Sequence, residues 1–289
     1  MSETVTLQHD WISCALCGAD DVVRLLSTRG HKPYRVYAGE MPLPVEGAET
    51  LVRCRHCGLA YINPQPRISA GLATYPPSEE RAYFEHTRVG RLDGAEQLLS
   101  QIKDLLPGCG RVLDIGCGDG VFLAVAQARG WDVFGIEASE HLVAALNAGA
   151  MAGRVMYGRA ESFCAGPCEY DLVVLLNVLE HLREPMRALR NAVQALRPGG
   201  VLAVHVPNYA WGRAYGRHWA QLEPLDHLYY WTPRTLSTAL VQVGLSPVAR
   251  FSLPGTSRWR AQIQRGINAI GLWPGSGLGW LARKANRRT

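Results

Sequence analysis

Residues 112–123 read VLDIGCGDGVFL, an apolar run that passes through three alternate glycines into a second apolar run. The first run predicts a buried strand, and the second begins a helical pattern that continues to Arg129. Glycine carries no side chain, so a ligand can approach the backbone of such a turn closely. A dinucleotide fingerprint would place its third glycine where Val121 stands, so the spacing disfavours NAD or FAD as the ligand.

Strand and helix patterns alternate around this turn. Strand patterns occupy residues 111–115, 132–136, 154–157, 170–176, 201–206 and 246–252, and helical spacing occupies residues 78–106, 121–129 and 185–196. Because parallel strands need helical crossovers, this alternation predicts an α/β, Rossmann-like fold with a doubly wound, mostly parallel sheet. After Ser252 the sequence is more typical of a helix and a basic tail, so either the sheet is shortened or the assignment fails there.

An acidic residue closes the second of these strands. Glu137 follows the glycine turn by about 20 residues, the spacing at which a carboxylate accepts hydrogen bonds from ribose hydroxyls. A glycine turn alone is weak evidence for a ligand, and this carboxylate strengthens it. The turn and Glu137 together favour a cofactor that contains a nucleoside, with a generic nucleotide-binding or purely structural Rossmann domain as the alternative.

Four motifs, at residues 114–120, 134–139, 170–181 and 196–200, carry a family resemblance. Over residues 111–252 the sequence resembles the class I S-adenosylmethionine-dependent methyltransferases, with the motifs in the same order and spacing. The resemblance implies S-adenosylmethionine as the cofactor, with glycines at its amino acid part, Glu137 at its ribose, and Asn177 with Val178 at its sulfonium end. The cofactor-binding residues it implies are Asp114, Gly116, Cys117, Gly118, Gly120, Glu137, Ala138, Ala160, Glu161, Asn177 and Val178.

One position departs from the family pattern. Many relatives have an acidic residue near the adenine amino group, where this chain has Arg159. The resemblance therefore leaves the adenine contact to the backbone of Ala160 or to Glu161.

Four cysteines near the start of the chain form two CxxC pairs, each followed by glycine. They are Cys14 with Cys17 and Cys54 with Cys57. The two-residue gap lets both sulfurs of a pair turn toward one ion, and four thiolates complete a closed tetrahedral zinc site. The spacing predicts a structural Zn²⁺, because a catalytic zinc would keep one position open. Redox chemistry of the CxxC pairs is the less favoured alternative.

The chain of 289 residues, 47% of them hydrophobic, is long enough for a full α/β core and a small accessory domain. We expect a zinc-binding module at residues 1–66, a helical connector over the cofactor site at 67–108, a methyltransferase domain at 109–254 and a basic extension at 255–289.

No secretory signal or transmembrane segment is evident, so we expect a cytoplasmic protein. Cysteines are kept reduced in that compartment, so the spacing of the eight cysteines favours metal binding over a disulfide framework.

Methyl transfer needs alignment of the acceptor, and a hydroxyl or acidic carbon also needs a proton acceptor. We predict His227 as this base and His181 as a secondary candidate, since both follow expected strand ends. Either histidine also suits a purely structural role. Four aromatic residues after Pro207, namely Tyr209, Trp211, Tyr215 and Trp219, suit either a substrate pocket or packing.

These features predict an S-adenosylmethionine-dependent methyltransferase that acts on carbon or oxygen of a small metabolite, or of an intermediate in a natural-product or sugar pathway. Sugar C-methyltransferases with a similar zinc module have a long C-terminal domain that this sequence lacks, which weakens a sugar assignment. A zinc-finger RNA base methyltransferase is the first alternative, although the net charge of +5 is mild and the cysteine region is not basic. A non-catalytic zinc scaffold is the second. The oligomeric state is not indicated by the sequence.

Overall fold

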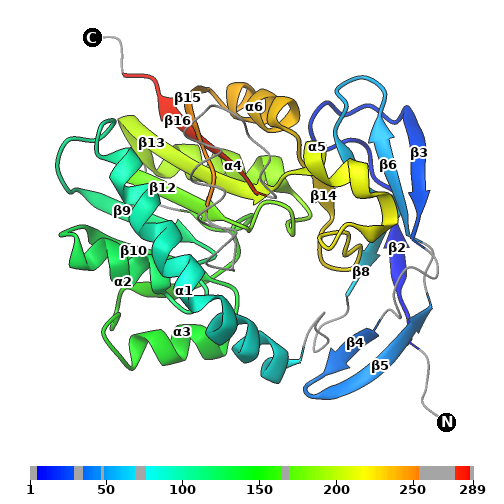
Figure 1. Ribbon diagram of the computed structural model, residues 1–289, viewed down its shortest axis with the longest axis horizontal. Helices are drawn as coiled ribbons and strands as arrows, with labels where there is room; N and C mark the ends of the chain where they lie inside the picture. The colour runs from blue at the N-terminus through cyan, green and yellow to red at the C-terminus, as the bar shows by residue number, and fades with distance from the viewer. Residues whose placement is uncertain are drawn as a thin grey trace.

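The computed structural model describes residues 5–28, 35–46, 49–68, 76–164, 169–253 and 277–286. Its centre is a seven-stranded sheet with the order β11-β10-β9-β12-β13-β16-β15 (Figure 1). The strands are β9 (Arg111–Ile115), β10 (Asp132–Glu137), β11 (Val155–Tyr157), β12 (Tyr170–Leu176), β13 (Leu196–Pro207), β15 (Leu245–Phe251) and β16 (Gly277–Lys284). Pairs from β11 to β13 are parallel, and β16 lies antiparallel between β13 and β15. The predicted fold class is confirmed.

Two helical layers cover this sheet. The helices are α1 (Pro77–Ile102), α2 (Val121–Ala128), α3 (Glu140–Asn147), α4 (Pro185–Ala195) and α6 (Pro233–Gln242). On β9, Val112 belongs to the core cluster of α1 and α2, whereas its neighbour Leu113 belongs to that of α4 and α6. Successive strand residues point to opposite faces, so each strand contributes to both layers. Because β10, β9 and β12 are neighbours and run parallel, the loops that follow them meet at one edge of the sheet.

The seventh strand lies where the sequence predicts a helix and a basic tail. β16 occupies Gly277–Lys284, so that prediction is wrong for these residues. Glycine weakens a strand pattern, yet here a Cβ on Gly277 would lie 2.4 Å from His205, and one on Gly279 would lie 2.7 Å from Phe251. The two basic side chains of β16 are bound to backbone carbonyls: Arg283 donates to that of Leu105 at 2.8 Å and Lys284 to that of Val193 at 2.7 Å. The rest of the predicted basic extension lies mostly outside the described residues.

The N-terminal module is joined to the α/β domain by backbone pairing. A four-stranded sheet has the order β14-β7-β6-β3, in which β3 (Val22–Ser27), β6 (Thr50–Cys54) and β7 (Ala60–Ile62) come from the module and β14 (Tyr229–Tyr230) from the domain. Tyr229 pairs with Tyr61 in the antiparallel register of β14 and β7. Figure 1 shows β14 between the central sheet and the module. The segment just before β14 is therefore held by both parts of the chain.

Short elements complete the structure. They are β1 (Val5–Thr6), β2 (Gln8–Asp10), β4 (Arg35–Ala38), β5 (Met41–Glu46), β8 (Gln65–Arg67), α5 (Tyr209–Gly212) and a 3-10 helix at Arg213–His218. Tyr209 and Trp219 pack against Tyr230 with ring centroids 5.6 and 5.9 Å from it, so they brace β14. None of the helices in the described ranges combines the length and apolar character needed to cross a membrane.

Candidate active site

The glycine turn after β9 is tightly enclosed. Gly116, Gly118 and Gly120 have φ angles of +76°, +54° and +75°, a region that favours glycine. A Cβ on Gly116 would lie 2.5 Å from Val178, and one on Gly118 would lie 3.0 Å from the Phe84 ring. The turn therefore lies between α1 and the loop after β12, with no room for side chains at these positions.

Glu137 lies at the end of β10, directly beside this turn. Its Oε2 accepts the Gly118 N–H and its Oε1 accepts the Ser139 N–H, both at 2.9 Å. Asp114 is buried behind the turn, and burial, with the nearby charges of Glu137 and Asp119, raises its pKa to about 8. The structure thus brings together the acidic residues and glycines that the first two motifs contain.

The loop after β12 adds a third group to this edge. Asn177 has a φ of +56°, rare for a residue with a side chain, and its Oδ1 accepts a hydrogen bond from His205 Nδ1 at 2.9 Å. Burial lowers the pKa of His205 to about 4, so the imidazole is neutral at pH 7. His205 was not identified as a site residue from the sequence. It lies beside Asn177 because β12 and β13 are neighbouring strands, and that pairing cannot be read from the local sequence.

The predicted adenine-side residues lie after β10 and β11. Asn191 of α4 donates through Nδ2 to the carbonyls of Ala160 and Glu161 at 2.9 and 3.0 Å, which fixes the backbone of this loop. Ala160 and Cys117 are buried, whereas Ala138 and Arg159 are exposed. Arg159 is exposed and basic, so it cannot act as the acidic residue expected beside the adenine amino group.

Helix α1 lies against the glycine turn through a network of contacts. The Arg91 guanidinium donates to Asp119 of the turn at 2.8 Å and to the Phe84 carbonyl at 2.8 Å. The same guanidinium stacks 4.9 Å from the centre of the Phe84 ring, which faces Gly118. The ion pair is half-buried, so it anchors α1 to the turn more firmly than a surface pair would.

The two predicted catalytic histidines lie side by side, although they are far apart in sequence. The rings of His181 and His227 have centroids 4.7 Å apart. His181 follows β12, and its pKa is lowered by burial but raised more strongly by the Asp226 hydrogen bond and by the charges of Glu180 and Asp226, to about 9. The neighbouring Glu180 is buried, which raises the pKa of its carboxyl. Glu180 and His181 follow Asn177 by three and four residues, and the ring contact adds His227 to this group.

The four cysteines also converge. Cys14 Sγ lies 3.4 Å from Cys57 Sγ, and Cys17 Sγ lies 3.4 Å from Cys54 Sγ. All four sulfurs lie within 4.8 Å of one another, so the cluster could hold a metal ion. Burial raises the pKa of Cys57 to about 11, so a cation beside it would be needed to ionise this thiol at pH 7. The glycines after each pair, Gly18 and Gly58, have φ angles of +76° and +83° that close the two turns.

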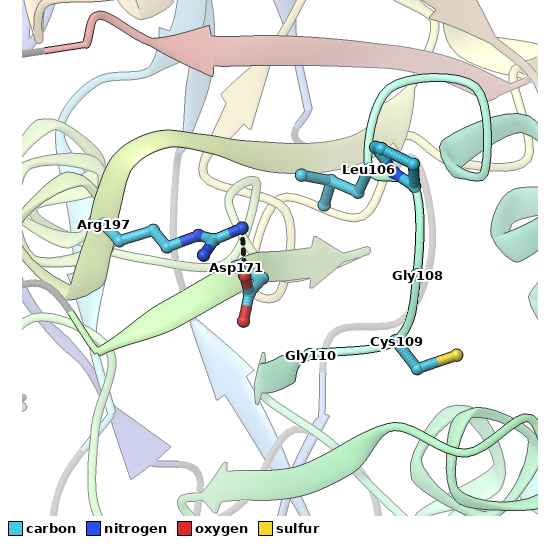
Figure 2. Close-up of a pocket in the computed structure, with 7 residues that line it drawn as sticks. Leu106, Gly108, Cys109, Gly110, Asp171 and Arg197 are labelled. Carbon is cyan, nitrogen blue, oxygen red and sulfur yellow. Dashed lines mark ion pairs between the residues drawn. The ribbon is translucent and has the colours of Figure 1, made fainter.

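A separate cavity of about 370 Å³ lies at the opposite edge of the sheet (Figure 2). It surrounds the start of β9, where Asp171 accepts the Arg111 N–H at 2.7 Å and pairs with Arg197 at 2.5 Å. Figure 2 shows this ion pair facing the segment from Leu106 to Gly110. The ion pair of Asp171 and Arg197 stabilises this edge of the sheet. Because the two charges neutralise each other, the cavity lining offers no unpaired charge to a ligand.

Known proteins match the chain in sequence. The family model described as a methyltransferase domain matches residues 84–250. A protein of Dinoroseobacter shibae named ubiquinone biosynthesis O-methyltransferase is 30% identical over 164 residues, which cover 52% of this chain and 66% of the relative. A protein of the same name from Caulobacter sp. strain K31 is 30% identical over 156 residues, 52% of each chain. The chain thus spans about half to two thirds of these relatives' length.

Solved structures also match the fold. A S-adenosylmethionine-dependent methyltransferase from Mesorhizobium loti has a TM-score of 0.51 and 22% identity, covering 67% of this chain and 100% of that chain. A Haloferax volcanii complex of the Trm112 methyltransferase activator with a methyltransferase described as putative has a TM-score of 0.53 and 15% identity, covering 73% and 98%. At these identities the likeness concerns the fold alone.

Proposed function

The chain belongs to the methyltransferase domain family, and from that premise we propose that it transfers a methyl group from S-adenosylmethionine to an oxygen of a small molecule. The observation that carries this proposal is Glu137, whose carboxylate lies beside three left-handed glycines at the edge where β9, β10 and β12 end. The relatives named O-methyltransferases favour oxygen over carbon as the acceptor atom.

The residues of this edge fit the cofactor. Gly116 and Gly118 carry no side chains, which lets the amino acid part of the cofactor approach the turn closely, and the Glu137 carboxylate suits the two ribose hydroxyls, with Ala138 beside it. Further proposed contacts are Asp114, Cys117 and Gly120 behind the turn, Ala160 and Glu161 at the adenine, and Asn177 with Val178 at the sulfur. When bound, S-adenosylmethionine supplies a methyl group on positively charged sulfur. The chain's own residues have to align the acceptor and exclude water.

The acceptor end is proposed to lie at His181 and His227. His181 follows the loop that carries Asn177 and Val178, and the His227 ring lies against it, so we place both on the sulfonium side of the proposed cofactor site. The proton of an acceptor hydroxyl has to leave as the oxygen attacks, and we assign the handling of that proton to this pair of histidines. His227 keeps the leading role that the sequence gives it.

Substitution of Gly118 by alanine is expected to weaken S-adenosylmethionine binding by at least about 10-fold, because the left-handed conformation costs a residue with a Cβ about 1–2 kcal/mol and that Cβ meets Phe84, so the turn leaves the shape that fits the cofactor. Gly153→Ala is the matched control, since Gly153 has a φ of +71° with no atom within 4 Å of its Cβ position. Both variants should lose thermal stability, and only the Gly118 variant should lose affinity. Equal cofactor affinities by calorimetry would show that the turn does not bind the cofactor.

Replacement of His227 by alanine is expected to lower kcat by about 100-fold, the usual contribution of a group that handles the acceptor's proton. Cofactor affinity should stay unchanged, since His227 contacts Gln221 and His181 and not the glycine turn. Turnover is measured with labelled cofactor, and exposed His218→Ala serves as the control. Unchanged turnover in the His227 variant would remove this residue from the reaction.

The substrate class is tested by incubating the full chain with methyl-labelled S-adenosylmethionine and two pools. One pool holds small phenols, alcohols and sugars, and the other holds RNA. The proposal predicts label in small-molecule products and none in RNA. Label in RNA alone would favour the zinc-finger RNA methyltransferase, and absence of label together with absence of cofactor binding would favour a non-catalytic scaffold.

We also propose that Cys14, Cys17, Cys54 and Cys57 hold a structural Zn²⁺. A tetrahedral zinc with Zn–S bonds of about 2.3 Å sets its sulfurs about 3.8 Å apart. The sulfur pairs at 3.4 Å are close to that value. Four thiolates leave no open position, so this ion would brace the module and take no part in the reaction. Cysteines bind zinc only when they are reduced, and thiols are kept reduced in the cytoplasm, so this site supports our proposal of a cytoplasmic location.

A further inference from the structure

Three ligand groups converge at the proposed acceptor end. Glu180, His181 and His227 each offer one ligand atom, and these atoms lie within 4.8 Å of one another. The arrangement is fixed by the backbone, because the Glu180 carbonyl accepts the N–H groups of Leu228 and Tyr229 at 2.8 and 3.1 Å. The loop after β12 and the segment before β14 are therefore held together by hydrogen bonds.

The orientation of both histidine rings follows from their hydrogen bonds. His227 Nδ1 lies 2.9 Å from the carbonyl of Gln221, and His181 Nδ1 lies 3.1 Å from the carbonyl of Asp226. A carbonyl only accepts, so Nδ1 is the donor in each ring and Nε2 is the nitrogen left to bind an ion. Histidines that bind metals show this pattern, in which the second nitrogen donates to a carbonyl or carboxylate.

Glu180 supplies the second, independent observation. Its side chain is 1% exposed, and neither carboxylate oxygen has a hydrogen-bond partner among the residues that the structure describes. Its Oε1 lies 3.9 Å from His181 Nε2. A buried carboxylate without a hydrogen-bond partner is costly, and a divalent cation held among these three side chains would offset that cost.

We propose that Glu180, His181 and His227 bind a divalent metal ion, which is distinct from the ion of the four cysteines. A carboxylate with two imidazoles is the donor set of catalytic zinc sites that keep a position open for water or substrate. The cysteine cluster, by contrast, is closed. This inference rests on the proposed function only for its role in the reaction, because the metal site itself is defined by the three side chains.

The open position would take the acceptor's hydroxyl oxygen. Coordination lowers the pKa of that hydroxyl, whose proton leaves to water. The oxygen lone pair then forms the bond to the methyl carbon, and the carbon–sulfur bond breaks with its electron pair going to sulfur. The products are a methyl ether and S-adenosylhomocysteine. In this arrangement His227 acts as a ligand that holds the ion, in place of the proton acceptor proposed above, and its alanine variant is again expected to lose kcat.

The test is the zinc content of the full chain after dialysis against Zn²⁺, with a thiol reductant present. Wild type is expected to hold two zinc ions per chain, and Glu180→Gln is expected to hold one, with second-site affinity at least about 100-fold weaker. His218→Ala, which removes an exposed histidine, should still hold two. One zinc ion in wild type, or two in the Glu180 variant, would overturn the site.

Two further measurements separate this site from the proposed function. Wild-type protein that transfers methyl groups while holding one zinc ion would overturn the metal site and keep the proposed function. Wild-type protein that holds two zinc ions and does not bind the cofactor would keep the metal site and overturn the proposed function.

If Glu180→Gln fails to fold, Asp226→Asn provides the second variant, because Asp226 Oδ1 lies 3.3 Å from His181 Nδ1. We expect its second zinc to bind about 10-fold more weakly. Unchanged zinc affinity in a folded Asp226 variant would contradict the site.

Discussion

Replacement of Cys54 by serine is expected to release the zinc ion of the cysteine cluster and to unfold the N-terminal module. Structural zinc sites contribute on the order of 10 kcal/mol to folding, which exceeds what the short strands of this module supply by themselves. Zinc content and thermal unfolding followed by circular dichroism measure the effect. Cys109→Ser is the matched control, because Cys109 is an exposed free thiol outside the cluster.

The same substitution is expected to abolish methyl transfer, although the proposed reaction does not involve the cysteines. β7 of the module pairs with β14, and the Ile62 N–H donates to the Leu228 carbonyl at 2.9 Å. Leu228 follows His227 directly, so loss of the module frees the segment that carries the histidine. A Cys54 variant that has lost its zinc and still turns over like wild type would show that the module does not support the active site.

Replacement of Glu137 by alanine is expected to weaken S-adenosylmethionine binding by about 100-fold or more. Hydrogen bonds to a charged group are worth about 1.5–3 kcal/mol each, and a ribose offers two hydroxyls to this carboxylate. The carboxylate also holds the Gly118 N–H at 2.9 Å, so its loss loosens the glycine turn. Glu140→Ala is the control, as an exposed acid in the first turn of α3. Equal affinities of the two variants by calorimetry would contradict the ribose assignment.

Much of the fold follows from sequence because its signals are local. The apolar run before Gly116 and the helical spacing after it predict β9 and α2 to within one or two residues. β16 could not be predicted in this way. Its residues Gly277 and Gly279 are glycines because His205 and Phe251 lie against them, and that contact exists only in the folded sheet.

The candidate site shows the same limit. Glycine φ angles and the position of Glu137 follow from a strand and a turn that are contiguous in sequence. The contact between His181 and His227 depends on hydrogen bonds from Leu228 and Tyr229 to Glu180, which join segments more than 40 residues apart. Sequence spacing therefore indicated each histidine as a candidate but gave no reason to group them with Glu180.

Titration of the purified, full-length protein with S-adenosylmethionine in a calorimeter tests the central claim most directly. Binding of one S-adenosylmethionine per chain, with an affinity reduced in Glu137→Ala and unchanged in Glu140→Ala, is the predicted result. Absence of binding by wild-type protein with its zinc in place would contradict the assignment of this chain as an S-adenosylmethionine-dependent methyltransferase.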